Sequence, residues 1–378
     1  MENQKTIIIA GGGYAGILAA NRLARKKLPL KLILITDKPN FQERIRNHQL
    51  LAGNLKKEYP ISDLLHKKIT LKLGKIDKIN GDKKEILLEN KETLSYDYLI
   101  YALGVQKLPS NPDLPNYISI AEVEDCRKMN QVLRQISKPK ITIIGAGLSG
   151  IETVAELAET FPHSELSIIE NGKLGSGFSD AARNWMIDHL TKNQVNILED
   201  TKVTSFSEGS IHTSAGFQLK HDICIFSNGL QASPVGSASS LPVNPKGQIL
   251  VNEFLGCKSH PEIIGAGDGI QVDSPSGSHL RMACASAMPM GIYAAERLSF
   301  LLGAKSKLGE KPFSLAYLGR NVSLGRKDGV VQSSLRDDTP IGIVWKAKAA
   351  ARIKETICKL TIFSMKMEKY FNFYLWKA

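Results

Sequence analysis

The sequence lacks any closely spaced pair of cysteines. Consecutive cysteines are at least 27 residues apart, which excludes the CxxC motifs of zinc knuckles and dithiol redox centres, and no metal site is indicated. Isolated thiols in a reducing compartment usually pack as small apolar side chains, and we expect that role here. The five cysteines are Cys126, Cys224, Cys257, Cys284 and Cys358.

Long apolar runs are also missing. No stretch approaches the roughly 18–20 apolar residues that span a bilayer. The apolar stretch in the opening "MENQKTIIIAGGG" is too short for a signal peptide, so we expect a cytoplasmic location. Hydrophobic residues still make up 43% of the 378 residues, which is enough for the cores of two or three domains.

Negative charge is in deficit. The chain has 37 acidic residues against 49 lysines and arginines, a formal net charge of +12. A surplus of this size favours contact with nucleic acid, an anionic membrane or an acidic protein. The position of the basic residues along the chain must decide among these three.

A glycine-rich turn follows the first apolar run. Residues 6–10 predict a short buried strand, and three glycines then appear in G-x-G-x-x-G spacing before an apolar helical pattern. Such a turn lets a pyrophosphate approach the backbone and meet the N-terminus of the helix. An acidic residue 21 positions after the last glycine ends a second predicted strand, where it would hold a ribose hydroxyl. The expected contacts at this first site are Gly11, Gly13, Tyr14, Ala15, Gly16 and Asp37.

The same pattern returns at residues 140–170. A second run of strand, spaced glycines and helix leads to another strand, which ends in Glu170, 20 residues after Gly150. An acidic residue there accepts a hydrogen bond from a free 2′-hydroxyl and repels a 2′-phosphate, so NADH is favoured over NADPH, although Lys173 keeps this preference moderate. The expected contacts at this second site are Gly145, Gly147, Leu148, Gly150 and Glu170.

Two complete turns imply two dinucleotides. A hydride donor and a flavin acceptor form the obvious pair, so we expect FAD at the first turn and NADH at the second. The sequence therefore predicts an α/β fold with two Rossmann-like, three-layer dinucleotide-binding domains. A C-terminal module that ends in an amphipathic helix follows them.

Two further segments point to a family. "YDYLIYALGV" (96–105) and "HPEIIGAGDGI" (260–270) are apolar strands that end in small residues. With the two glycine turns, they make the chain resemble the two-dinucleotide-fold flavoproteins of the pyridine nucleotide-disulfide oxidoreductase superfamily, without the redox disulfide. Within it, the chain looks most like the type II NADH:quinone oxidoreductases. The resemblance implies FAD contacts from Ala102, Gly104, Gly267 and Asp268.

The resemblance also implies roles for residues outside these motifs. In "FQERIRNHQLLAG" (41–53), Arg44 and Arg46 would lie near the flavin pyrophosphate, or else in a solvated basic loop. Glu152 would face the NADH, or else complement the dipole of its helix. Asn228 and Gly229 in "FSNGL" would lie beside the nicotinamide.

One segment departs from the family pattern. Relatives that reduce quinone usually carry a glutamine-containing AQxAxQ motif on the helix after the Gly-Asp pair, whereas this chain reads "RMACASAMPMGIYAAERL" (281–298). The resemblance places Cys284, Ala287 and Met288 near the flavin, although no residue is a certain catalytic group. A soluble electron acceptor, or a non-catalytic role as an NADH-binding redox sensor, therefore remains an alternative to quinone reduction.

The C-terminus concentrates the positive charge. Residues 346–378 contain eight lysines and arginines but only Glu355 and Glu368. Apolar residues recur there at helical steps and aromatic residues end the chain, a pattern typical of helices that bind a membrane surface. We expect this segment to bind an anionic membrane on the inner face of the cell, as in the family, and nucleic acid to be excluded. Docking of the helix on the FAD domain and homodimerisation are the alternatives.

These expectations define the domain boundaries. Residues 1–110 and 235–310 would form the FAD domain, and residues 111–234 the NAD(H) domain, because both the first glycine turn and Asp268 must reach one flavin. Residues 311–378 would form the C-terminal membrane-associating module. The proline-rich stretch at 108–117 would link the first two domains.

Overall fold

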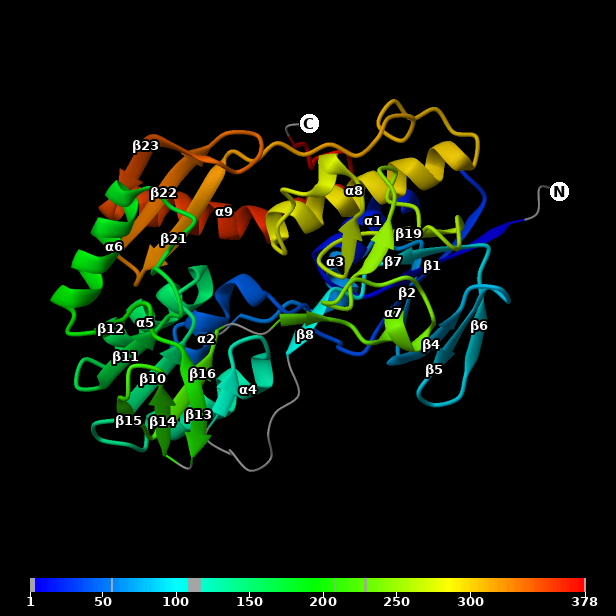
Figure 1. Cartoon of the computed structure of the whole chain (residues 1–378). Helices are drawn as coiled ribbons and strands as arrows, with labels where there is room; N and C mark the ends of the chain where they lie inside the picture. Colours follow the sequence, from blue (N-terminus) through cyan, green and yellow to red (C-terminus); the bar gives the residue numbers. More distant parts are fainter. Residues whose placement is uncertain (1–3, 56, 108–116, 208, 228–229, 377–378) are drawn as a thin grey trace.

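Figure 1 shows two α/β bodies that are joined side by side and share a C-terminal layer. The computed structural model describes residues 4–55, 57–107, 117–207, 209–227 and 230–376. The fold class predicted from the sequence is confirmed, because each glycine turn belongs to its own parallel sheet flanked by helices.

The first sheet contains five parallel strands in the order β19-β7-β1-β2-β3. Its central strand carries Ile7, Ile8 and Ile9, all fully buried, as expected for a parallel sheet covered on both faces. Helices α1 (Tyr14–Ala24) and α8 (Cys284–Leu301) pack against each other beside it. The strands are β1 (Lys5–Ala10), β2 (Leu30–Thr36), β3 (Ile69–Leu73), β7 (Tyr98–Tyr101) and β19 (Ile263–Gly265).

The chain therefore leaves the first sheet after β7 and returns to it at β19. The strand pair that borders this excursion is β8 (Val105–Lys107) with β17 (Leu230–Ala232), which run antiparallel. This arrangement agrees with an inserted second body, while the exact domain boundaries remain a prediction. The stretch 108–116 of the predicted linker lies outside the described residues.

The second sheet is also parallel, in the order β12-β11-β10-β16-β9. Its own apolar core lies around Ile143, Ile151 and Leu157. The strands are β9 (Tyr117–Ser119), β10 (Lys140–Ile144), β11 (Glu165–Ile169), β12 (Asn196–Leu198) and β16 (Ile223–Phe226), with helices α4 (Val123–Leu133), α5 (Leu148–Thr160) and α6 (Asp180–Lys192).

Both bodies also contain short strands and helices outside the two main sheets. Two three-stranded antiparallel sheets and one parallel pair extend the edges. The strands are β4 (Ile76–Asn80), β5 (Glu85–Leu88) and β6 (Thr93–Ser95); β13 (Val203–Ser207), β14 (Ser210–Thr213) and β15 (Gln218–Lys220); and β18 (Ile249–Val251) with β20 (Ile270–Val272). The short helices are η1 (Arg44–Arg46), α2 (Asn47–Ala52), α3 (Ile61–Leu64), α7 (Val235–Ala238) and η2 (Pro275–Gly277).

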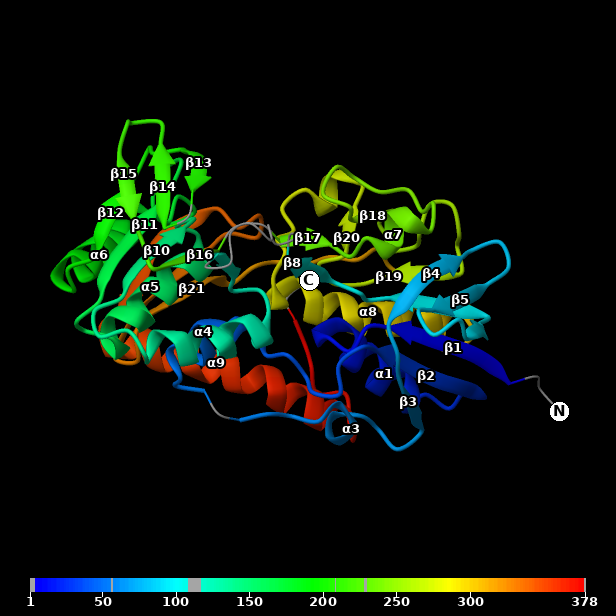
Figure 2. The ribbon, with the colours of Figure 1, turned by 90° about the horizontal axis from the view of Figure 1, so that it is seen from below.

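The C-terminal layer contains a small antiparallel sheet and a long helix. Strands β21 (Gly319–Leu324), β22 (Asp328–Ser334) and β23 (Pro340–Lys346) form an antiparallel sheet, and helix α9 (Ala347–Glu368) packs across it and against α1. Figure 2 shows α9 running along one edge of the molecule, beneath both bodies. Within the described part of the chain, no helix has the length and apolarity to cross a bilayer.

Helix α9 is shorter than the lysine- and arginine-rich stretch of residues 346–378 suggested. It ends at Glu368, whose Oε2 accepts hydrogen bonds from the backbone N–H groups of Phe373 (3.1 Å) and Tyr374 (3.0 Å) as the chain bends back. The Trp376 indole N–H donates to the Ser314 carbonyl at 2.8 Å. Part of the terminal aromatic segment is therefore packed on the first body and does not continue the helix.

Candidate functional site

The first glycine turn has the geometry of a nucleotide cradle. Gly11 has φ +114°, and a Cβ at this position would lie 2.2 Å from the Ala102 carbonyl oxygen. A Cβ on Gly16 would lie 1.9 Å from the Gly11 oxygen, so this glycine allows α1 to pack against the turn. No atom lies within 4 Å of a Cβ built on Gly13. The middle glycine therefore faces open space at the N-terminus of α1, where a pyrophosphate would bind.

The second turn repeats this geometry. A Cβ on Gly150 would lie 1.9 Å from the Gly145 oxygen, whereas one on Gly147 would meet nothing within 4 Å. Glu170 follows β11, and its Oε2 accepts a hydrogen bond from the Ala146 N–H at 2.7 Å. Leu148 is the first residue of α5. The predicted contacts of the second dinucleotide are thus gathered around one helix N-terminus.

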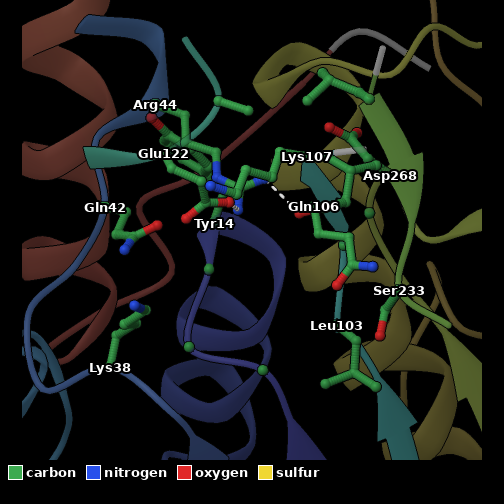
Figure 3. Close-up of a pocket in the computed structure, with 18 of the residues that line it drawn as sticks. Tyr14, Lys38, Gln42, Arg44, Leu103, Gln106, Lys107, Glu122, Ser233 and Asp268 are labelled. Carbon is green, nitrogen blue, oxygen red and sulfur yellow. Dashed lines mark hydrogen bonds and ion pairs between the residues drawn. The ribbon is translucent and has the colours of Figure 1, made fainter. Parts of the chain in front are cut away.

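One cavity of about 930 Å³ connects the two bodies. Gly13 and Asp37 of the first site line it, as do Ser149, Glu152 and Ser227 beside the second turn. Figure 3 shows Lys38, Gln42 and Arg44 on one side, Gln106, Ser233 and Asp268 on the other, and Tyr14 at the start of α1 between them. The predicted site residues in its lining are Gly11, Gly13, Tyr14, Ala15, Asp37, Arg44, Ala102, Gly104, Glu152, Gly267, Asp268, Cys284 and Ala287.

Asp268 occupies the place that the Gly-Asp motif predicts. Burial raises the pKa of this carboxyl to about 6, against the opposing effects of a hydrogen bond from the Ala283 N–H and the charge of Arg44. The Ala283 N–H lies 3.0 Å from Oδ1, directly before the first residue of α8. Asp268 therefore places an acceptor on the cavity wall next to a helix N-terminus.

Several predicted residues lie elsewhere. Arg46 is buried behind the wall, where its guanidinium pairs with Glu43 (2.8 Å) and Glu355 (2.8 Å), so it is not available to a pyrophosphate. Met288 is buried in α8 and does not line the cavity. The remaining members of the second site surround the turn outside this cavity lining: Gly145, Gly147, Leu148, Gly150 and Glu170. Gly16 packs beneath the first turn, and Asn228 and Gly229 lie outside the described residues.

Cys284 lies on the cavity wall but is not an activated thiol. Burial, as the largest effect, raises its pKa to about 11, so the thiol stays protonated at neutral pH. All five cysteines are free. Among the described residues no cluster of three potential metal ligands occurs.

A buried cluster of charged groups at the cavity was not predicted from the sequence. Lys354 Nζ of α9 lies 2.9 Å from Glu152 Oε1, and His48 Nδ1 lies 3.7 Å from Glu152 Oε2. The Ser323 N–H donates to Glu152 Oε1 at 3.0 Å. Burial opposes ionisation of both partners, but Lys354, as the largest favourable charge, lowers the pKa of Glu152, and Glu152 in turn raises that of Lys354.

This cluster changes the interpretation of two residues. Glu152 lies in the second turn of α5 and the first turn carries no acidic residue, so complementing the helix dipole does not explain it. Lys354 belongs to the basic C-terminal segment, yet its side chain is only 13% exposed. Nothing in the neighbouring sequence distinguishes Lys354 from the exposed lysines around it. Its burial beside Glu152 results from the packing of α9.

The residues present fit the two dinucleotides. Each open glycine at an α-helix N-terminus leaves room that a side chain would fill, and each following strand ends at an acidic residue, Asp37 or Glu170. The cavity is lined by residues of the first turn and by Glu152 on the helix of the second. FAD would be held along the first turn, Asp37 and Asp268, with NADH approaching from the second turn.

Comparison with known proteins places this geometry in context. The family model described as "Pyridine nucleotide-disulphide oxidoreductase" matches residues 5–291. Ferroptosis suppressor protein 1 of Xenopus laevis is 25% identical over 88% of this chain and 89% of its own length. Demethylphylloquinone reductase NdbB of Synechocystis sp. is 26% identical over 87% and 86%. NDH2 of Plasmodium falciparum, solved in complex with NADH, superposes with a TM-score of 0.81 over 98% of this chain and 99% of its own, at 16% identity.

Proposed function

Because the chain belongs to the pyridine nucleotide-disulphide oxidoreductase family, we propose that it passes electrons from NADH through FAD to a membrane quinone without pumping protons. Membership in this family makes the chain an oxidoreductase with sites for FAD and NAD(H), which confirms the cofactor prediction. The quinone acceptor, the membrane location and the role of each residue form the proposal.

The cavity that spans both bodies is the observation that carries the proposal. Residues of the first turn, such as Gly13, and Glu152 beyond the second turn line the same space. Two dinucleotides held at these turns would therefore reach the same cavity, as direct hydride transfer requires. The chemistry that bound FAD supplies is the acceptance of a hydride and the return of two electrons.

The chain's own residues bind and orient. The backbone at Gly13 and Gly147 gives each pyrophosphate access to a helix N-terminus. Asp37 and Glu170 are placed to accept hydrogen bonds from ribose hydroxyls. Arg44 donates to the Val105 carbonyl and faces the cavity, so of the two predicted arginines it is the one we assign to the flavin phosphates.

Proton supply is the task that we assign to the buried charged cluster. Reduction of a quinone to a quinol consumes two electrons and two protons, of which NADH supplies both electrons and one proton. The second proton must come from solvent. Lys354 Nζ holds a proton next to Glu152 on the cavity wall, whereas burial lowers the pKa of His48 to about 4 and keeps its imidazole neutral. The cluster thus holds one proton, on Lys354, beside the cavity, and solvent would have to replace it after each turnover.

The outer face of α9 supports a membrane location. Leu360 and Phe363 are 45% and 46% exposed, and Arg352 and Lys359 are exposed on the same side of the helix. A helix that exposes both kinds of side chain binds a lipid surface through its apolar side chains and anionic headgroups through its cations. Its inner face is docked on β22 and α1, so membrane binding and docking use different sides of one helix.

The names of similar proteins support a quinone as the acceptor. One relative is a demethylphylloquinone reductase, and NADH is the ligand in the solved NDH2 complex. The missing glutamines on α8 favour a soluble acceptor instead. The two acceptors can be distinguished by experiment because only the membrane quinone requires the exposed face of α9.

The test is a substitution on that face. Deletion of residues 346–378 would remove Lys354 and the buried Glu368, and would therefore damage the fold. The variant Leu360→Glu/Phe363→Glu changes only exposed side chains. We expect it to keep NADH oxidation by a hydrophilic dye while losing vesicle binding and reduction of vesicle-embedded quinone. Quinone reduction at the wild-type rate would contradict the membrane proposal.

A further inference from the structure

A second element lies beside the C-terminal end of α9. We call residues 57–68, which include α3, the basic segment. Lys369 Nζ donates to the Asp63 carbonyl at 2.8 Å, and Lys366 Nζ lies 5.5 Å from the centre of the Tyr59 ring. The Asn21 side-chain amide donates to carbonyls on both elements, at 2.8 Å to Leu64 and 3.1 Å to Met365. The basic segment and α9 are therefore fixed relative to each other.

The basic segment presents cations to solvent. Lys57, Lys67 and Lys68 are exposed, and Lys57 Nζ lies 5.1 Å from the centre of the Tyr59 ring. Its acidic side chains are Glu58, which is paired with Arg127, and the exposed Asp63. Burial is the largest cause of the lowered pKa of His66, and the charges of Lys68, Lys67, Arg25 and Lys369 lower it further.

The segment that carries these lysines contacts the C-terminal end of α9, the helix that also carries exposed apolar residues. Figure 2 shows α3 and α9 on the same lower edge of the molecule. The contacts of Lys366 with Tyr59 and of Lys369 with Asp63 join the two elements where the exposed side chains of α9 end. Lysines next to apolar and aromatic side chains match the headgroup boundary of a bilayer, where Tyr is enriched. A double-stranded nucleic acid would not require the apolar residues.

We propose that the basic segment and α9 form one surface that binds anionic phospholipids. In this arrangement Lys57, Lys67 and Lys68 contact headgroups while Leu360 and Phe363 enter the lipid. The inference rests on the proposed membrane function and extends it, because the sequence pattern indicated a membrane contact only in residues 346–378. The basic segment adds a second point of contact and fixes how the molecule is oriented on the bilayer.

The test compares two matched double variants of the full-length protein. Lys67→Gln/Lys68→Gln removes two exposed cations from the basic segment. Lys78→Gln/Lys83→Gln removes two exposed cations from the β4–β5 region, away from α9. Binding is measured by flotation with vesicles of phosphatidylcholine alone or of an equimolar mixture with phosphatidylglycerol. Thermal unfolding and the absorbance of bound flavin check that each variant is folded.

We expect the wild type to bind the anionic vesicles and Lys67→Gln/Lys68→Gln to bind them about 30-fold more weakly, since each lysine near an anionic surface contributes about 1 kcal/mol. The control variant should bind like the wild type. Equal binding by all three proteins, with Leu360→Glu/Phe363→Glu still impaired, overturns the role of the basic segment and leaves the proposed function intact. A wild type that floats with neither vesicle, even if it retains DNA in a gel shift, overturns both.

Discussion

Lys354 Nζ, on the C-terminal helix, lies 2.9 Å from Glu152 Oε1, on the helix that follows the second glycine turn. The two side chains are 13% and 7% exposed, and Glu152 lines the cavity between the two bodies. The C-terminal helix therefore supports the wall of the proposed active site from behind, through Lys354, and also carries the proposed membrane contact. One helix can in this way hold the reaction cavity close to the lipid surface.

Replacing Lys354 alone should destabilise the fold. The change Lys354→Met leaves the Glu152 carboxylate buried without its partner, which costs about 3–5 kcal/mol in comparable pairs. The double variant Lys354→Met/Glu152→Gln removes both charges and should recover most of this loss. Urea unfolding of the wild type and the two variants measures the effect. Equal stability of the single and double variants would show that Lys354 does not neutralise Glu152.

His48 should make stability depend on pH. Burial lowers the pKa of its imidazole from 6.5 to about 4 in the folded protein, so protonation favours the unfolded chain. The free energy of unfolding should therefore fall as the pH decreases from 6.5 towards 4, by about 2–3 kcal/mol at pH 4.5, and this contribution should be absent above pH 6.5. In His48→Asn this part of the decrease should disappear. Urea unfolding of the wild type and of His48→Asn at pH 6.5 and at pH 4.5 tests this. An equal decrease in the free energy of unfolding of the two proteins would contradict it.

Neighbouring glycines of the second turn should respond differently to alanine. A Cβ on Gly147 enters open space, so Gly147→Ala should fold normally, retain flavin and raise the KM for NADH at least about tenfold by obstructing the pyrophosphate. A Cβ on Gly150 would lie 1.9 Å from the Gly145 oxygen, so Gly150→Ala should lower the melting temperature. Steady-state kinetics and thermal unfolding separate the two effects. An unchanged KM for NADH in Gly147→Ala would show that the pyrophosphate does not bind at this turn.

Glu170 should set the preference for NADH. Its carboxylate, at the end of β11, accepts hydrogen bonds from Ala146 (2.7 Å) and Gly172 (3.2 Å), which fixes it where a 2′-hydroxyl would bind. Glu170→Gln should raise the KM for NADH about tenfold, because a charged hydrogen bond contributes about 1.5–3 kcal/mol, and should lower the KM for NADPH. Glu165→Gln, on the exposed start of the same strand, is the control. If Glu170→Gln has the same ratio of the KM for NADH to the KM for NADPH as the wild type, this role is contradicted.

Much of the fold could be predicted because its signals are local. Spaced glycines between an apolar strand and a helix identify each turn, and their strand partners at 96–105 and 260–270 also end in small residues. The structure brings Gly13, Ala102 and Asp268 to one cavity, although they are far apart in the chain. Such residues meet because ligands of parallel α/β sheets bind at the carboxyl ends of the strands.

The rest depended on tertiary packing. Arg44 and Arg46 are separated by one residue and have the same side chain, but only Arg46 meets Glu43 and Glu355 and is buried. The periodicity of the C-terminal helix indicated an apolar face, yet the face that docks includes Cys358, Thr361 and the buried Glu368. Glu368 becomes a core residue there because Arg22 of α1 pairs with it, and Thr361 donates to the Cys358 carbonyl of its own helix. No sequence window contains both Arg22 and Glu368.

Anaerobic mixing of the purified, flavin-containing protein with NADH tests the central claim most directly. Two dinucleotides that meet in one cavity should allow NADH to bleach the visible absorbance of the flavin rapidly and stoichiometrically, and Gly147→Ala should slow this step at low NADH concentration while leaving the flavin bound. A protein that binds flavin but is not bleached by NADH, or one that takes up no flavin at all, would contradict the account.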